Sequence, residues 1–124
     1  MSVIVNDDGF GADLWVSEIL DVASDAAPED LQSQLNAPLI RVDFPSFADG
    51  RGFTIARRLR LMGFAGRLRA RGHVIADQYA MARRAGFDEV EISEELAERQ
   101  PASQWLERAD WQAHDYQSRL RKPA

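Results

Sequence analysis

The spacing of apolar positions changes repeatedly between residues 39 and 92, and each change predicts a new element of secondary structure. Residues 39–44 are a β-branched and aromatic run, which predicts a strand. After a polar turn, apolar side chains recur three or four positions apart up to Met62, which predicts a helix. Residues 67–71 alternate arginine with leucine or alanine, and this period of two predicts a strand with one apolar and one arginine side.

A second helical pattern covers residues 74–85 and ends before Gly86, which tolerates the positive φ of a helix end. Residues 88–92 predict a third strand. The order strand–helix–strand–helix–strand is typical of parallel strands joined by right-handed crossovers. We therefore expect a small α/β domain with a β-α-β-α-β core at residues 39–92 and a mostly parallel sheet, similar to a slice of a barrel. Flanking segments or a second copy of the chain, in a homo-oligomer, would cover the sheet edges.

Weaker patterns flank this core. Residues 3–5 and 14–16 are short apolar runs, and the Asp- and Gly-rich segment between them predicts two short strands or a hairpin. Ser93 caps a predicted helix that continues to about residue 99, and residues 102–120 predict a C-terminal helix. A chain of 124 residues has the length of one domain, so residues 1–124 are expected to fold as a single unit.

Composition narrows the chemistry. The chain has no cysteine, which excludes disulfides, thiolate catalysis and cysteine-ligated metal sites, and its two histidines lack clustered carboxylates, so no metal site is expected. A net charge of −5 argues against general nucleic-acid binding. No apolar run approaches the roughly 20 residues of a membrane span, and the start lacks the basic region of a signal peptide. A cytoplasmic protein without membrane contact is expected.

Charge is distributed unevenly. The interval between Asp49 and Asp77 contains seven arginines and no acidic residue, whereas the sequence on either side is acidic. The interval opens with a polar turn in which two glycines flank Arg51. An acidic protein that gathers positive charge in one segment is expected to hold an anion there or to meet an acidic partner.

In parallel α/β folds, ligands bind at the carboxyl ends of the strands, where the predicted turns at residues 48–52, 72–73 and 93–94 would meet. An arginine in such a turn suits bidentate binding of sulfate or phosphate, and glycines permit close backbone approach. The alternative is a structural turn in which an aspartate and an arginine pair locally. The candidate ligand-binding residues are Asp49, Gly50, Arg51, Gly52, Arg69, His73, Asp77 and Gln78.

Three of these candidates raise separate questions. Arg69 lies on a predicted strand, where a buried charge needs a carboxylate partner, and Asp77 is the nearest candidate. Gln78 falls on an apolar helix face. Either Asp77 and Gln78 bind a ligand or order the turn around Gly50, or they form an internal hydrogen-bond network that fixes helix on sheet. His73 suits proton donation, although a histidine in a turn is more often exposed. By contrast, Arg57 and Arg60 are expected to face solvent or a partner.

Residues 44–60 include the run Phe-Pro-Ser-Phe-Ala-Asp-Gly-Arg-Gly-Phe, and a second stretch of motif residues extends from Gly66 to Asp88. Together they resemble the signature of the bacterial DUF934 proteins. This chain departs from the family at His73, where an acid is expected, and at Ala85, where a cysteine is common. A thiol at position 85 is therefore not essential, and an acid–base scheme built on position 73 is weakened.

The resemblance implies a role in assimilatory sulfur metabolism, because members tend to be encoded beside sulfite reductase and the reductase of activated sulfate. It implies an accessory protein of sulfite and sulfate reduction that binds a small oxyanion or docks on the reductase or another sulfate-assimilation enzyme. The alternative is an enzyme that acts on a small oxyanion-bearing substrate, in line with the oxidoreductase label that members often carry. The glycine pair lacks the third glycine and the following acid of a dinucleotide fingerprint, so the residues give that label no support. Catalytic residues and a cofactor stay unassigned.

Overall fold

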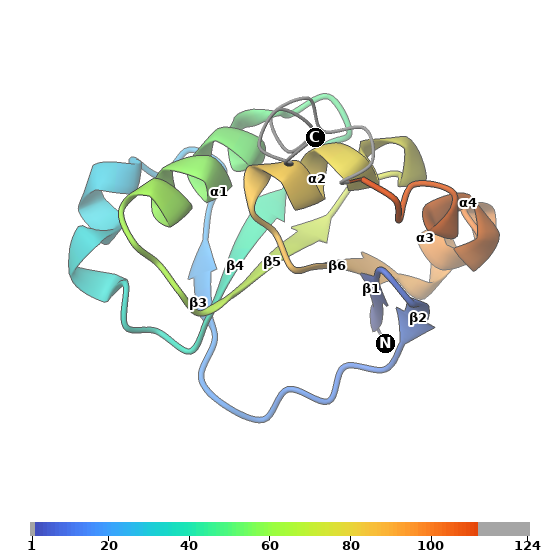
Figure 1. Cartoon of the computed structure of the whole chain (residues 1–124), viewed down its shortest axis with the longest axis horizontal. Helices are drawn as coiled ribbons and strands as arrows, with labels where there is room; N and C mark the ends of the chain where they lie inside the picture. Colours follow the sequence, from blue (N-terminus) through green and yellow to red (C-terminus); the bar gives the residue numbers. More distant parts are fainter. Residues whose placement is uncertain (1, 112–124) are drawn as a thin grey trace, which may run out of the picture.

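A computed structural model of the chain describes residues 2–111. Its centre is a six-stranded sheet in the order β2-β1-β6-β5-β4-β3 (Figure 1). The four strands β3 to β6 are parallel neighbours, and the hairpin of β1 and β2 extends the sheet by antiparallel pairing of β1 with β6. The strands are β1 (Ser2–Asn6), β2 (Gly9–Gly11), β3 (Leu20–Val22), β4 (Leu39–Phe44), β5 (Arg67–Gly72) and β6 (Glu89–Ser93).

Helices cover one face of this sheet, and α1 and α2 lie side by side upon it (Figure 1). The expected α/β fold with a mostly parallel sheet is confirmed, as is the strand–helix order between residues 39 and 92. No helix within residues 2–111 is long and apolar enough to cross a membrane. The helical segments are η1 (Pro28–Gln34), α1 (Arg51–Leu61), η2 (Ala76–Gln78), α2 (Tyr79–Ala85), α3 (Glu94–Arg99) and α4 (Ala102–Leu106).

The hydrophobic core lies between the helices and the sheet. Alternate residues of the central strands point into it and are buried, which accounts for the period-two pattern of the sequence. The facing sides of α1 and α2 bury residues at helical spacing. The strand residues concerned are Ile40, Val42, Phe44, Leu68, Ala70, Val90 and Ile92, and the helix residues are Ile55, Ala56, Leu59, Tyr79, Ala82 and Ala85.

The N-terminal prediction was right about a hairpin and wrong about its second strand. Residues 14–16 are not in a strand; β2 comes earlier, at Gly9–Gly11. Because β2 and β3 form opposite edges of the sheet, the chain between them has to cross the face without helices. We call residues 12–19 the strap. This crossing leaves Leu14 and Val16 exposed to solvent.

The second helix is shorter than predicted. Ile75 is extended, the 3-10 turn η2 follows, and α2 begins only at Tyr79. This shift rotates the helix, so that Met81 is exposed rather than buried. Gly86 ends α2 with a φ of 120°, as expected. The predicted cap of α3 is confirmed, because the Leu96 N–H donates to Ser93 Oγ at 3.1 Å. In the predicted C-terminal helix, α4 covers Ala102–Leu106, and residues 112–120 lie outside the described part of the chain.

Gly52 allows α1 to pack closely on β4. A methyl group at this position would overlap Cζ of Phe44, far inside van der Waals contact. We expect Gly52→Ala to lower the free energy of unfolding by about 1–3 kcal/mol, because a core aromatic ring has to move. Urea unfolding followed by tryptophan fluorescence measures this loss.

Gly50→Ala is the matched control, because the nearest atom to a methyl group there is Phe53 Cδ2 at 4.0 Å. We expect this variant to lose less than about 1 kcal/mol. Equal losses in the two variants would show that the packing of Gly52 on Phe44 is not the cause.

Candidate functional site

The turns that follow β4, β5 and β6 lie at the carboxyl edge of the parallel sheet, as expected from the strand order. A cleft of about 260 Å³ opens there beside β5 and β6. Its position is the usual ligand position of an open parallel sheet. The lining residues are Phe47, Gly72, His73, Ser93, Glu95, Leu96 and Arg99.

Asp49 and Arg51 pair with each other in the turn after β4. Arg51 Nε and Nη2 donate to the two carboxylate oxygens of Asp49 at 3.0 and 2.8 Å, and the Arg51 backbone N–H donates to Asp49 Oδ1 at 3.1 Å. The side chain of Arg51 holds the pKa of Asp49 well below its usual range. Arg51 Nη2 also donates to Ser24 Oγ at 3.0 Å. This is the local pairing that the structural-turn interpretation predicts.

Gln78 connects the turn after β5 with the turn after β4. Its Oε1 accepts from the Ile75 N–H at 3.0 Å, and its Nε2 donates to the Phe47 carbonyl at 3.0 Å. His73 is exposed, and its ring lies edge-on to Phe47 with 5.2 Å between the centroids. Gln78 thus joins the two turns through internal hydrogen bonds.

Asp77 and Arg69 do not meet, so the predicted pair is wrong. Asp77 is exposed and pairs with Arg108 at 2.7 Å. Arg69 points to the opposite side of the sheet from the helices, where its Nε donates to Glu89 at 2.6 Å and its Nη1 to Glu91 at 2.8 Å. Its side chain is 2% exposed. Arg69 therefore belongs to a different site from the turn at the carboxyl edge.

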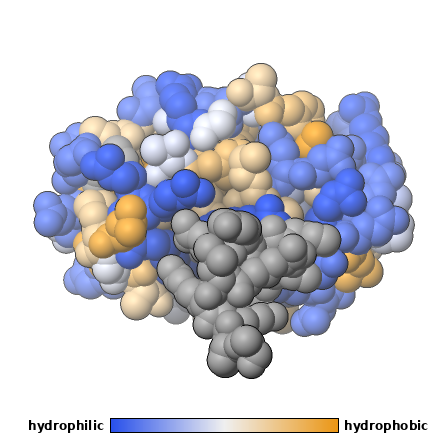
Figure 2. Space-filling model, turned by 45° about the horizontal axis from the view of Figure 1, so that its top comes forward, coloured by the Kyte–Doolittle hydropathy of each residue, from blue (hydrophilic) through white to orange (hydrophobic). Residues whose placement is uncertain are grey.

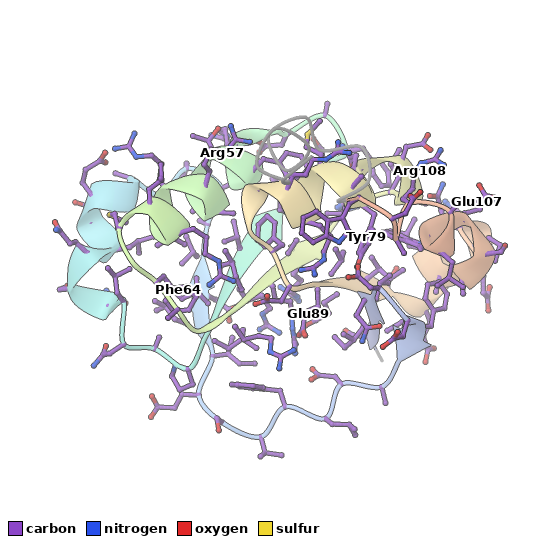
Figure 3. All side chains as sticks on the ribbon, viewed as in Figure 1. Arg57, Phe64, Tyr79, Glu89, Glu107 and Arg108 are labelled. Atoms are coloured by element: carbon purple, nitrogen blue, oxygen red, sulfur yellow. The ribbon has the colours of Figure 1, made fainter. Side chains whose placement is uncertain are left out.

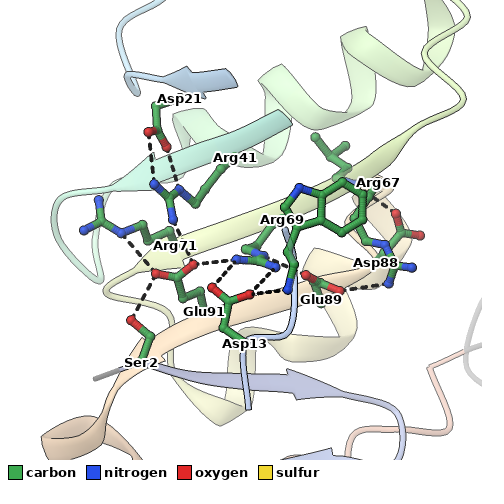
Figure 4. A network of polar contacts seen from close by, with 12 residues as sticks. Ser2, Asp13, Asp21, Arg41, Arg67, Arg69, Arg71, Asp88, Glu89 and Glu91 are labelled. Carbon is green, nitrogen blue, oxygen red and sulfur yellow. Dashed lines mark hydrogen bonds and ion pairs between the residues drawn. The ribbon is translucent and has the colours of Figure 1, made fainter. Parts of the chain in front are cut away.

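That second site is a network of charged side chains on the face of the sheet without helices (Figure 4). The parallel register places β3 Asp21, β4 Arg41, β5 Arg69 and β6 Glu89 in one row. Arg71 and Glu91 lie in a second row, two residues further along the strands. Ion pairs form within each row and between the two rows, so each charged side chain has a neighbour of opposite charge. We call it the open-face network, and its members are Asp13, Asp21, Arg41, Arg67, Arg69, Arg71, Glu89 and Glu91.

Glu91 is the most connected carboxylate of the open-face network. It accepts hydrogen bonds from Arg69, Arg41 and Ser2 at 2.8 to 3.1 Å. Burial raises its pKa, but the hydrogen bonds from Arg69 and Arg41 outweigh burial and leave the pKa below its ordinary value. The pKa of Asp13 is lowered in the same way, against burial, chiefly by the hydrogen bond from Arg69.

Most arginines of the acid-free interval are thus bound within the protein. Arg60 was expected to face solvent, but it donates to the carbonyls of Phe64, Gly66 and Gly86 and to Asp88. It joins the end of α1 to the end of α2, where three carbonyl groups need donors. Arg57 does project from the outer side of α1, as predicted (Figure 3).

The carboxylates that bind Arg69 were missed in the sequence, although a signal for two of them exists. Glu89 and Glu91 alternate in phase with the arginines at residues 67–71, and pairing the two strands in parallel register brings them together. Asp13 has no such signal, because its position depends on the route of the strap. Among the described residues, no group of three or more histidines and carboxylates is arranged to hold a metal ion.

The sequence model of a bacterial protein family of unknown function, DUF934, matches residues 20–124. The chain therefore belongs to the DUF934 family, as its motifs predicted. Neither a curated protein nor a solved structure matches the chain.

The lowered pKa of Glu91 predicts the response of the protein to acid. Its carboxyl releases its proton more readily in the folded chain, so the unfolded chain binds more protons as the pH falls below the ordinary value of 4.5. The free energy of unfolding should be nearly constant from neutral pH down to that value and should decrease below it. Urea unfolding across this pH range measures the slope.

Glu91→Gln should lower the free energy of unfolding by about 3 kcal/mol at pH 7, because it removes one charge from buried ion pairs. It should also flatten the acid slope. Glu98→Gln, on the exposed side of α3, is the control and should change neither quantity appreciably. A Glu91→Gln protein with the acid slope of the wild type would contradict the role of Glu91.

Proposed function

We propose that this protein is an accessory protein of assimilatory sulfite and sulfate reduction that docks on sulfite reductase or another enzyme of that pathway. The pathway rests on membership of the DUF934 family and on the gene neighbourhood that the resemblance implies. The docking rests on one feature of the surface, the strap.

The strap presents apolar side chains to solvent. Leu14 is 82% exposed and Val16 is 97% exposed, two positions apart on the same segment. Trp15 between them is half-buried, and its ring lies 5.9 Å from the guanidinium of Arg67. An anchored aromatic residue flanked by exposed aliphatic ones, beside arginines, has the composition of a protein-binding surface.

The rest of the surface supports the same choice. In the view of Figure 2, hydrophilic residues make up most of the coloured surface, and apolar residues gather near its centre and upper edge. The arginines, which suggested contact with an acidic partner, are largely neutralised by internal ion pairs. Docking is therefore expected to depend on apolar contacts at the strap and to persist at salt concentrations that screen surface charges.

The second candidate is an enzyme or binding protein for a small oxyanion at the carboxyl edge. One observation favours it: Arg51 is 60% exposed, and its Nη1 makes no hydrogen bond within residues 2–111. The cleft beside His73 lies at the same edge. Calorimetry with sulfate and sulfite tests it, because Arg51→Ala should abolish any binding that occurs there.

Docking is tested by pull-down with sulfite reductase subunits. We expect wild-type protein to retain the reductase at about 0.5 M salt, and Leu14→Glu/Val16→Glu to lose at least about tenfold of this binding, since two charges would have to enter an apolar contact. Leu61→Glu is the control, because Leu61 is 77% exposed on α1, on the other side of the sheet, and should bind like the wild type. Absence of wild-type binding, or equal loss in the control, would refute docking at the strap.

The pathway is tested by growth of a deletion strain on single sulfur sources. Growth on sulfide or cysteine, but not on sulfite or sulfate, is expected, because the missing step would be sulfite reduction. Complementation with the wild-type gene should restore growth, and complementation with Leu14→Glu/Val16→Glu should not. Normal growth of the deletion strain on sulfate would overturn the assignment to this pathway.

A further inference from the structure

We propose that the terminal N–H pair of Arg69 is a binding site for a carboxylate or a small sulfur oxyanion, and that Asp13 of the strap closes it in the free protein. The opening of the site by a partner rests on the proposed function, because a partner that docks on Leu14 and Val16 would lift the strap from Arg69. The binding site itself depends only on contacts within the chain.

Arg69 has a fixed side and an exchangeable side (Figure 4). Its Nε and one Nη1 hydrogen are held by the buried carboxylates of Glu89 and Glu91 at 2.6 and 2.8 Å. The terminal Nη1 and Nη2 face Asp13 at the longer distances of 3.2 and 3.3 Å. Two parallel N–H groups facing two oxygens is the geometry in which arginine binds a carboxylate or sulfate. Asp13 thus occupies the place of an anionic ligand.

The charge balance of the directly paired side chains favours an anion in this place. The directly paired set contains four arginines and four carboxylates, with Asp13 as the fourth carboxylate. Asp43, in register with Arg71, makes no ion pair with the set. Without Asp13 the paired set has one excess positive charge, next to a side chain that is 2% exposed. A buried charge without a partner is costly, so this position favours a replacement anion.

A hollow of about 250 Å³ under the strap gives the ligand room. Arg67 and Arg69 both line it. The side chain of Arg67 donates only through Nη1, to Glu89 at 2.9 Å, and its Nε and Nη2 make no hydrogen bond within residues 2–111. A second cationic side chain therefore stands beside the Arg69 position, with donors available to an anion.

The strap is held by few contacts. Asp13 is 32% exposed at its side chain, and Leu14 and Val16 bury almost nothing. The indole N–H of Trp15 donates within the strap, to the Glu18 carbonyl at 3.3 Å, and not to the sheet. Within the described residues, the Asp13–Arg69 pair and the contact of Trp15 with Arg67 join the strap to the network. Replacing Asp13 with another anion removes the first of these and loosens the strap.

Asp13→Asn tests the site. Asparagine has the size of aspartate and keeps an oxygen that accepts from the backbone N–H of Trp15, but it removes the negative charge. Sodium sulfate, and separately sodium formate, is titrated by calorimetry at constant ionic strength. We expect Asp13→Asn to bind at least one of these anions at least about tenfold more tightly than the wild type, because an intramolecular competitor is lost. Tighter binding of formate than of sulfate identifies a carboxylate as the ligand, and the reverse identifies an oxyanion.

Asp21→Asn is the matched control, because Asp21 is an exposed carboxylate of the same network that binds Arg41 and not Arg69. It should bind both anions like the wild type. Equal affinities in Asp13→Asn and the wild type would overturn the proposal. An equal gain in Asp21→Asn would also overturn it, by showing that net charge and not the Arg69 position determines binding.

A spin label on Val16→Cys provides a second measurement in the otherwise wild-type chain, which has no cysteine of its own. High sulfate or formate, against chloride at equal ionic strength, should displace Asp13 and raise the mobility of the label. A label whose mobility never changes would overturn the proposal even if Asp13→Asn fails to fold. No partner takes part in either experiment, so their failure leaves docking intact, and a failed pull-down leaves the anion result intact.

Discussion

The pairing of arginines with glutamates across β4, β5 and β6 is the constraint on which the rest of the structure depends. One face of each strand is apolar and packs under α1 and α2, and the other face is charged. A slip of one residue in register would turn arginines and glutamates into the core. A slip of two would keep arginines opposite glutamates, with Arg67 beside Glu89 and Arg69 beside Glu91, pairs that already interact diagonally. The ion pairs therefore specify which face of each strand is charged, and the apolar face and the connections of the chain fix the register.

A second polar contact joins the N-terminal hairpin to the helix side. Asp7, between β1 and β2, accepts hydrogen bonds from the Tyr79 hydroxyl at 2.5 Å and from Arg83 at 3.2 Å. Burial, followed by the hydrogen bond to Asp7, raises the pKa of Tyr79, so the hydroxyl remains a donor at physiological pH. The hairpin is thereby fixed at the β6 edge, and the strap begins from a defined position. Its route over Arg69 follows from that start and from the position of β3.

The sequence was sufficient to predict the elements of the core, but it was insufficient to predict the contacts between residues far apart in the chain. A β-branched and aromatic run located β4, a helical period located α1 and a period of two located β5, because local patterning decides those elements. The three-residue strand β3 was missed, since a strand that short has too few positions for a period. Arg69 was identified as a charge that needs a carboxylate, but Asp77 was the wrong partner. Choosing among carboxylates requires the register and the route of the strap, which no local pattern contains.

The fold changes the interpretation of the uneven charge along the sequence. The acid-free interval supplies arginines to strands and helices whose carboxylate partners come from the acidic segments on either side, so the separation along the chain is cancelled in space. Internal pairing leaves little net field to attract an acidic partner, because opposite charges at contact distance screen one another. Specific recognition must then come from a group whose internal partner is replaceable. Asp13 meets that condition better than Glu89 or Glu91, because it alone of the three belongs to a loop and binds Arg69 at the longer distances.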